Sequence, residues 1–219
     1  MTVTRAVSGD GNLRPGRMIE LAPWSLTTLI AQIASHGYRW IDYQSVDEAT
    51  QRLHLQRAIA THHVILGEHP AGIYVGKPNH LSRRLVVEDG GFLYDSDSYA
   101  DDLPYWVHDY GRPHLVIPYS LDCNDMRFAQ ALEGDRFFHY LRDAFDVLYA
   151  EGLQRPRMMS VGLHCRVVGR PGRALGLAKF MDYVKAQSDV WICQRVEIAR
   201  HWHAHHPAVG SIPEHEASA

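Results

Sequence analysis

The sequence has few cysteines and almost no imbalance of charge. Its 219 residues include only three cysteines, which are widely spaced and form no CxxC pair. This argues against a disulfide framework or a cysteine-based zinc knuckle, and fits a reducing cytoplasm. Lysine and arginine total 22 against 25 aspartate and glutamate, a formal charge of −3. The charge therefore gives no reason to expect binding to nucleic acid or to an anionic membrane.

Long apolar runs are also missing. No stretch approaches the roughly 18 consecutive apolar residues that a transmembrane helix needs. The first 20 residues are polar and rich in glycine and arginine, and they lack the apolar core of a secretory signal. Hydrophobic residues make up 46% and charged residues 21%, the balance of a globular protein with enough length for one large or two small domains.

Histidine, in contrast, is abundant, with 15 copies. The densest group lies near the end, where His201 and His205 have the i,i+4 spacing of helical zinc ligands. No glutamate lies between them, and Pro207 follows, which favours a surface segment over a metal site. His36 and His164 lie instead in segments that are dense in other reactive side chains.

Apolar runs alternate with segments of helical periodicity over most of the chain, which predicts βα units and a mainly parallel sheet. Capping residues, Pro171 near a helix start, and glycines after apolar stretches set the expected boundaries. Strands are predicted at 71–76, 92–94, 114–119, 158–163 and 190–193, and helices at 22–33, 45–67, 82–88, 135–152, 171–184 and 196–203.

Polar side chains follow the predicted strands. In parallel sheets the carboxyl ends of the strands carry the chemistry, so these groups are expected to share one edge. Loops after strands are polar in any case, and this alternative stays open. The groups are Asp95 and Asp97, Asp122 and Asn124, His164, and Gln194 and Arg195.

Three segments carry most of the reactive side chains. Residues 33–44 include His36, which could be catalytic or simply hydrogen-bonded in the core. Residues 94–106 hold four carboxylates with several aromatic rings, suited either to a small polar ligand or to solvent. Residues 160–173 include His164, whose imidazole suits acid–base work near neutral pH. A Cys165–His164 nucleophile is disfavoured because neighbouring strand residues point to opposite faces.

Read together, these segments resemble the metal-independent allantoinase branch of the polysaccharide deacetylase (NodB-like) family. The resemblance covers residues 33 to about 207. The matching strings are IASHGYRWIDYQ (33–44), RRLVVEDGGFLYDSDSYADDLPYW (83–106), PHLVIPYSLDCNDMRF (113–128), FDVLYAEG (145–152) and MMSVGLHCRVVGRPGR (158–173). It implies an α/β fold, a distorted (β/α) barrel, and hydrolysis of the hydantoin ring of allantoin to allantoate in purine breakdown.

The resemblance also implies roles for particular residues. His164 matches the late family histidine and is expected, with His36, to be catalytic. The second histidine of the family's HxxxH-like metal motif falls on Trp40, and an indole cannot bind a metal, so no metal or other cofactor is expected. Asp95 and Asp97 are expected to contact substrate or to orient a histidine. The full set of expected substrate-binding residues is Asp95, Asp97, Tyr99, Trp106, Asn124 and Arg170.

In this family a longer segment, with early strands and an acidic motif, precedes the His36 motif. Residues 1–32 do not match it, so the sequence predicts a barrel portion at 33–207 that is incomplete at its N-terminus, with a polar tail at 208–219. The expected partners are allantoin and further copies of this chain. Two alternatives stay open: a metal-dependent carbohydrate N-deacetylase, and a catalytically impaired truncated homologue.

Overall fold

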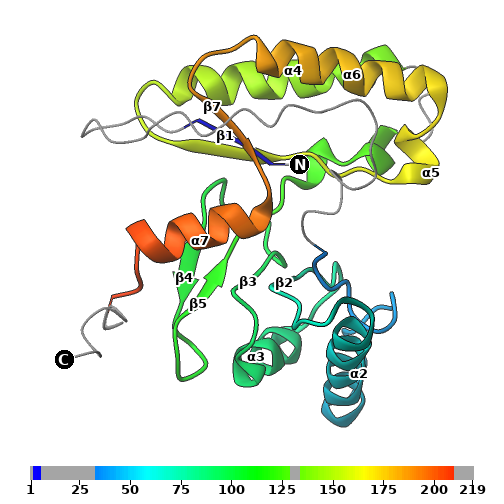
Figure 1. Cartoon of the computed structure of the whole chain (residues 1–219), viewed down its shortest axis with the longest axis vertical. Helices are drawn as coiled ribbons and strands as arrows, with labels where there is room; N and C mark the ends of the chain where they lie inside the picture. The colour runs from blue at the N-terminus through cyan, green and yellow to red at the C-terminus, as the bar shows by residue number, and fades with distance from the viewer. Residues whose placement is uncertain (1, 6–32, 129–133, 210–219) are drawn as a thin grey trace. The chain divides into compact units, whose positions relative to one another are not determined.

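The computed structural model describes residues 2–5, 33–128 and 134–209 (Figure 1). These residues form two compact units, and each is considered by itself. The first unit contains residues 2–5, 99–103, 119–128 and 134–194, and the second contains 33–98, 104–118 and 195–209. The helix predicted at 22–33 falls almost wholly outside the described residues, as do most of the unmatched segment 1–32 and the tail from residue 210.

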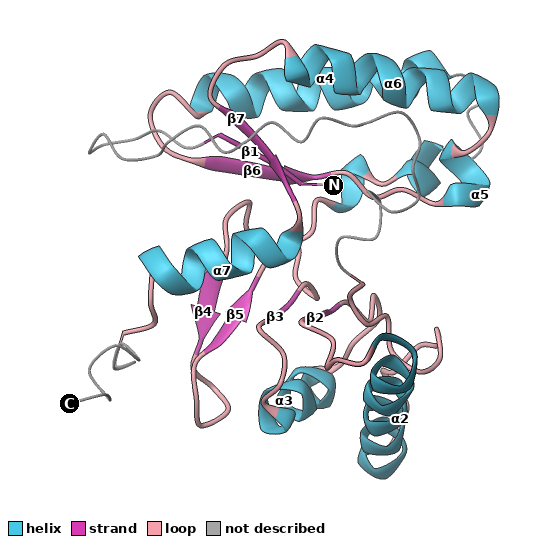
Figure 2. Cartoon of the chain, in the orientation of Figure 1, coloured by secondary structure: helices cyan, strands magenta, loops and turns pink. Residues whose placement is uncertain are grey.

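The first unit is a layer of two helices on a three-stranded sheet (Figure 2). The strand order is β6-β1-β7, and β1 is antiparallel to both neighbours. Helices α4 and α6 lie side by side and cover the sheet. The elements are β1 (Thr2–Arg5), β6 (Arg157–Ser160), β7 (Val190–Cys193), α4 (Gly134–Glu151) and α6 (Pro171–Lys185).

The prediction of a mainly parallel sheet is wrong for this unit. β6 and β7 run in the same direction, as a β-helix-β crossover requires, but they do not pair with each other. β1 is inserted between them, with Thr2 opposite both Ser160 and Cys193. The four residues of β1 are too few to show an apolar alternation, so the sequence pattern left this strand unassigned.

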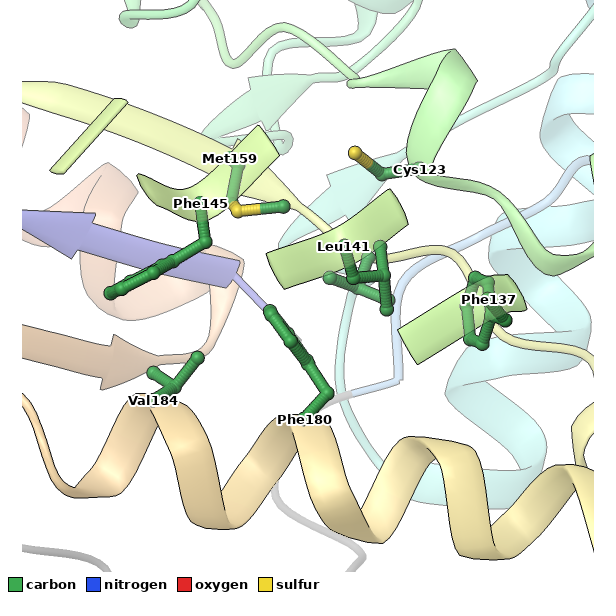
Figure 3. Packing of buried hydrophobic residues seen from close by; sticks show 8 residues of the cluster. Cys123, Phe137, Leu141, Phe145, Met159, Phe180 and Val184 are labelled. Carbon is green, nitrogen blue, oxygen red and sulfur yellow. The ribbon is translucent and has the colours of Figure 1, made fainter. Parts of the chain in front are cut away.

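The core of the first unit lies between α4, α6 and the sheet (Figure 3). Phe137, Leu141 and Phe145 recur every fourth residue along α4 and are almost fully buried, which confirms the apolar stripe predicted for this helix. Phe180 and Val184 face them from α6 with no exposed surface. Burying each such side chain contributes about 1.5–3 kcal/mol, so this contact holds the helix layer in place.

Glycine allows α4 and α6 to approach closely. A Cβ on Gly176 would lie 2.2 Å from the carbonyl oxygen of Gly134, a backbone atom that cannot rotate away. We expect Gly176→Ala to lower the free energy of unfolding by about 2–3 kcal/mol, as overpacking of a filled contact does. Gly172→Ala in the same helix is the matched control, because a Cβ there meets nothing within 4 Å. Chemical denaturation measures both variants, and equal effects would contradict this account.

The second unit contains a four-stranded sheet in the order β2-β3-β5-β4. β2, β3 and β5 are parallel, which confirms the βα pattern here, whereas β4 adds an antiparallel edge that the sequence did not predict. An apolar cluster of Tyr43, Ile73, Val75, Val86 and Phe92 packs around β2. The elements are α2 (Glu48–Leu66), β2 (Gly72–Ile73), α3 (His80–Asp89), β3 (Tyr94–Asp95), β4 (Tyr105–Val107), β5 (His114–Val116) and α7 (Arg195–His205).

The ends of α2 and α3 follow from capping chemistry. α2 begins at Glu48, later than predicted. Its N-cap is Asp47, not Ser45, and Asp47 accepts the free backbone N–H of Thr50 at 2.9 Å. Asn79 caps α3 through a capping box with Ser82. Gly67 and Gly90 end the two helices in the left-handed conformation, as the sequence predicted.

No helix in the described part of the chain is both long enough and apolar enough to cross a lipid bilayer.

Candidate active site

His164 and Asp125 form a close pair in the first unit. Asp125 begins the short helix η2 (Asp125–Phe128), and His164 immediately precedes the short helix α5 (Cys165–Val168). Asp125 Oδ2 accepts the backbone N–H of His164 at 2.7 Å, and its Oδ1 lies 2.6 Å from Nδ1 of the imidazole. The carboxylate is 3% exposed and the imidazole 32%, so a buried anion holds a histidine that solvent can reach.

This geometry suits proton transfer. With Nδ1–H donating to the carboxylate, the lone pair of Nε2 is left for a substrate or a water. Nε2 has no hydrogen-bond partner among the described residues. The sequence predicted His164 but not Asp125, although Asp125 stands in the polar run that follows the predicted strand at 114–119. Its position after a predicted strand was the feature of the sequence that could have identified Asp125 as a site residue.

The predicted strand at 158–163 ends earlier, at Ser160. His164 is therefore a helix cap and Cys165 the first residue of α5, so the strand argument against a Cys–His pair does not apply. Cys165 is exposed, and no hydrogen bond joins the two side chains among the described residues. The observed partner of His164 is Asp125.

Three expected substrate-binding residues also lie in the first unit. Asn124 donates from Nδ2 to the Tyr119 hydroxyl at 2.8 Å and accepts the Met126 N–H at 2.9 Å. Tyr99 packs edge-on against Tyr119, with ring centroids 6.4 Å apart. Arg170 is exposed just before α6. Asn124 is thus adjacent to the Asp125–His164 pair, while contact of these residues with substrate stays a prediction.

In the second unit, Asp95 is the centre of a buried charge cluster. Arg83 binds both of its carboxylate oxygens, at 2.9 and 3.1 Å, and His114 Nε2 lies 3.2 Å from Oδ2, off the line of a hydrogen bond. Asp95 is 1% exposed and His114 4%. Burial raises the pKa of Asp95, but the combined effect of His114 and Arg83, which lower it, is larger. The pKa of Asp95 therefore lies below the ordinary value. Asp95 is therefore charged at neutral pH.

Asp97 lies two residues further on and behaves differently. Its two oxygens accept the backbone N–H groups of Val75 and Gly76, at 2.9 and 2.8 Å. Burial raises the pKa of Asp97 to about 6, and these two hydrogen bonds only partly oppose the effect. Nearby Asp95 raises the pKa as well. Two carboxylates on one short segment thus have opposite pKa shifts, an arrangement that is common in active sites.

His36 is exposed and lies against the turn that follows β2. Its Nδ1 is hydrogen-bonded to the carbonyl oxygen of Tyr74, and its ring stacks on the Tyr74 ring with centroids 5.4 Å apart. Trp40, at the place of the second family histidine, is 71% exposed. Within residues 2–5, 33–128 and 134–209, no three histidine, cysteine, aspartate or glutamate side chains are grouped so as to hold a metal ion. The described residues do not fit the family's metal site.

Trp106 and Arg195 fasten α7 in the second unit. The Trp106 indole N–H donates to the carbonyl of His206 at 2.7 Å, and its ring meets His203 edge-on at 4.8 Å. Arg195 donates to Ser96 Oγ and to the Ile117 carbonyl, both at 2.9 Å. These contacts are structural, and the substrate-binding role of Trp106 stays a prediction.

The eight expected site residues therefore divide between the two units. The first unit brings together His164 and Asn124, with Tyr99 and Arg170 on the same unit. The second brings together His36, Asp95 and Asp97, with Trp106 on β4.

Known proteins share this α/β arrangement. No protein-family model matches the sequence. A polysaccharide deacetylase homologue of Schizosaccharomyces pombe is 40% identical over 196 residues, which cover 80% of this chain and 61% of that protein. The crystal structure of a polysaccharide deacetylase homologue from Pseudomonas aeruginosa is 54% identical, with a TM-score of 0.77 over 81% of this chain and 61% of that one.

Two further crystal structures complete the comparison. A Puue allantoinase is 57% identical, with a TM-score of 0.77 over 81% of this chain and 60% of the allantoinase. A polysaccharide deacetylase homologue from Mycobacterium smegmatis is 28% identical, with a TM-score of 0.70 over 83% of this chain and 67% of that one. Over about 80% of its length the chain is similar to proteins of the polysaccharide deacetylase family, and its predicted fold class is confirmed. It spans about 60% of the length of the first three relatives.

Proposed function

We propose that this chain is a cyclic amidohydrolase that opens the hydantoin ring of allantoin to give allantoate in purine breakdown. The observation that carries the proposal is its 57% identity to an allantoinase over 81% of the chain. The replacement of the second family metal-ligand histidine by Trp40 supports it, because a tryptophan at that place suits a hydrolase that works without the family metal.

The His164–Asp125 pair supplies the proton chemistry that such a hydrolysis needs. Nε2 of His164 takes a proton from water as the water oxygen bonds to the ring carbonyl carbon. The resulting imidazolium, stabilised by Asp125, then gives that proton to the ring nitrogen as the C–N bond breaks. Water and the cyclic amide are consumed and a ring-opened carboxylic acid is formed, which releases its proton to solvent to leave the carboxylate, so atoms and charge balance.

The other expected residues take supporting roles in this proposal. His36 is proposed as the second catalytic histidine: with its Nδ1–H donating to the Tyr74 carbonyl, its exposed Nε2 is left to accept a hydrogen bond from a water or a substrate N–H. Asn124, Tyr99, Arg170 and Trp106 are proposed to hold the ureido and ring groups of the substrate. We also propose that the chain works in the cytoplasm and that it forms a homo-oligomer. Size-exclusion chromatography with light scattering tests the oligomer.

We expect the purified protein to convert allantoin to allantoate at a rate that a metal chelator leaves unchanged. The product is measured by a colorimetric assay for glyoxylate after acid hydrolysis of allantoate. No turnover by folded protein would instead identify a catalytically impaired homologue. Activity that is lost with chelator and restored by zinc, or release of acetate from N-acetylated sugars, would favour the carbohydrate deacetylase alternative.

A further inference from the structure

The turn after β2 carries the backbone acceptor of His36. Tyr74 offers its carbonyl oxygen to the imidazole Nδ1 and its ring as a stacking surface. The Tyr74 N–H donates to the carbonyl of Ser35 at 2.9 Å, and the Ser35 N–H donates to Gly72 at 2.8 Å. The segment that bears His36 is thereby joined to β2, and the place of the imidazole depends on where the turn lies.

Asp97 holds that turn through its carboxylate. Each of its carboxylate oxygens accepts one backbone N–H, from Val75 and from Gly76, so the two residues after Tyr74 are both fixed. Gly76 has a positive φ of 86°, a conformation that leaves both N–H groups pointing to one acceptor. A two-oxygen acceptor without a proton is the side chain that satisfies both donors at once.

Asp97 is itself held by the buried charge cluster. The Asp97 N–H donates to Asp95 Oδ1 at 2.9 Å, and its carbonyl accepts from Arg83 at 2.8 Å. A chain of contacts thus runs from Arg83 and Asp95, through Asp97 and the 75–76 turn, to Tyr74 and His36. Every link in it lies within the second unit.

We propose that Asp97 is a positioning residue, which orients the His36 imidazole through the backbone turn at 75–76 rather than by touching substrate. The inference rests on the proposed function, in that His36 works on the substrate there. This role explains why the Asp97 carboxylate is kept where burial disfavours its charge. The charged and titratable groups near it are Asp95 on β3, Arg83 on α3 and His114 on β5 beyond Asp95. His36 lies close to Gly76, whose N–H Asp97 accepts.

The test is Asp97→Asn, with Asp97→Ser as a second variant in case the first fails to fold. Asparagine offers one oxygen, so one of the two backbone N–H groups loses its acceptor and the turn shifts. We expect kcat for allantoin to fall about 10–100-fold with KM changed less than twofold, since a small misplacement of a catalytic group costs this much. We also expect the ring signals of His36 in heteronuclear NMR to move, with circular dichroism unchanged.

Asp109→Asn is the matched control, because Asp109 is an exposed aspartate in a turn of the same unit. It should leave kcat and the His36 signals as in the wild type. Wild-type kcat together with unmoved His36 signals in the folded Asp97 variants would overturn the inference. If no form of the protein hydrolyses allantoin, the proposed function fails while the NMR signals of His36 still decide whether Asp97 positions it.

Discussion

Replacing His164 by alanine should lower kcat for allantoin hydrolysis by about 10²–10⁴-fold, the contribution of a positioned general acid–base group. The imidazole is about one-third exposed and belongs to neither of the apolar clusters described above, so its removal costs the hydrogen bond to Asp125 but leaves the packed cores, and with them the fold, in place. Steady-state kinetics and a denaturation curve measure the two effects separately. Near-normal kcat in the folded variant would remove His164 from the catalytic role.

Asp125→Asn should cause a loss of similar size, since an amide beside Nδ1 no longer stabilises the imidazolium and favours the wrong tautomer. Asp122→Asn is the matched control, because Asp122 lies three residues earlier in the same polar run and, among the described residues, bonds the exposed Tyr140 hydroxyl and the Cys123 thiol but not His164. Equal losses in both variants would point to damage to the loop rather than to the pair.

Much of the fold could be predicted because the first unit's helices carry strong periodic patterns. The stripe on α4, Pro171 at the start of α6 and the run at 190–193 all lie where the sequence placed them. The errors occur where elements are short. β4 has three residues and α5 has four, too few for a periodicity to show, and both depend on contacts with segments distant in sequence.

The same distinction separates the predicted and missed parts of the site. His164 could be found because a histidine after an apolar strand is conspicuous. Nothing in the sequence ranks Asp125 above its acidic neighbours. Its role depends on its contact with His164, a residue 39 positions away that η2 places beside it. The buried partners of Asp95 were missed for a similar reason. In the sequence, Arg83 has the pattern of a surface residue of a helix, and only the folded structure places it beside Asp95 on β3.

Arg83→Ala should lower the free energy of unfolding by about 3 kcal/mol, because it leaves the charge of Asp95 buried without its main partner. Asp95 is 2% exposed at its side chain and Arg83 is 23%, so the low end of the range for broken buried pairs applies. Urea denaturation measures the loss. Arg52→Ala is the matched control: Arg52 also bridges to carboxylates, Glu48 and Glu88, but on the surface, where water replaces the pair at little cost.

The pH dependence of this loss identifies its origin. The pKa of Asp95 in the folded protein lies below its ordinary value, so the stabilisation is fully present above about pH 4 and is lost as the pH falls through the folded-state pKa. Arg83 also lowers the pKa of Asp97, which burial raises to about 6, so the gap between wild type and Arg83→Ala should begin to narrow near pH 6 and narrow further as Asp95 takes up its proton in more acidic solution. A gap that persisted unchanged below pH 3 would show that Arg83 stabilises the fold by packing of its aliphatic stem, since that contribution does not titrate.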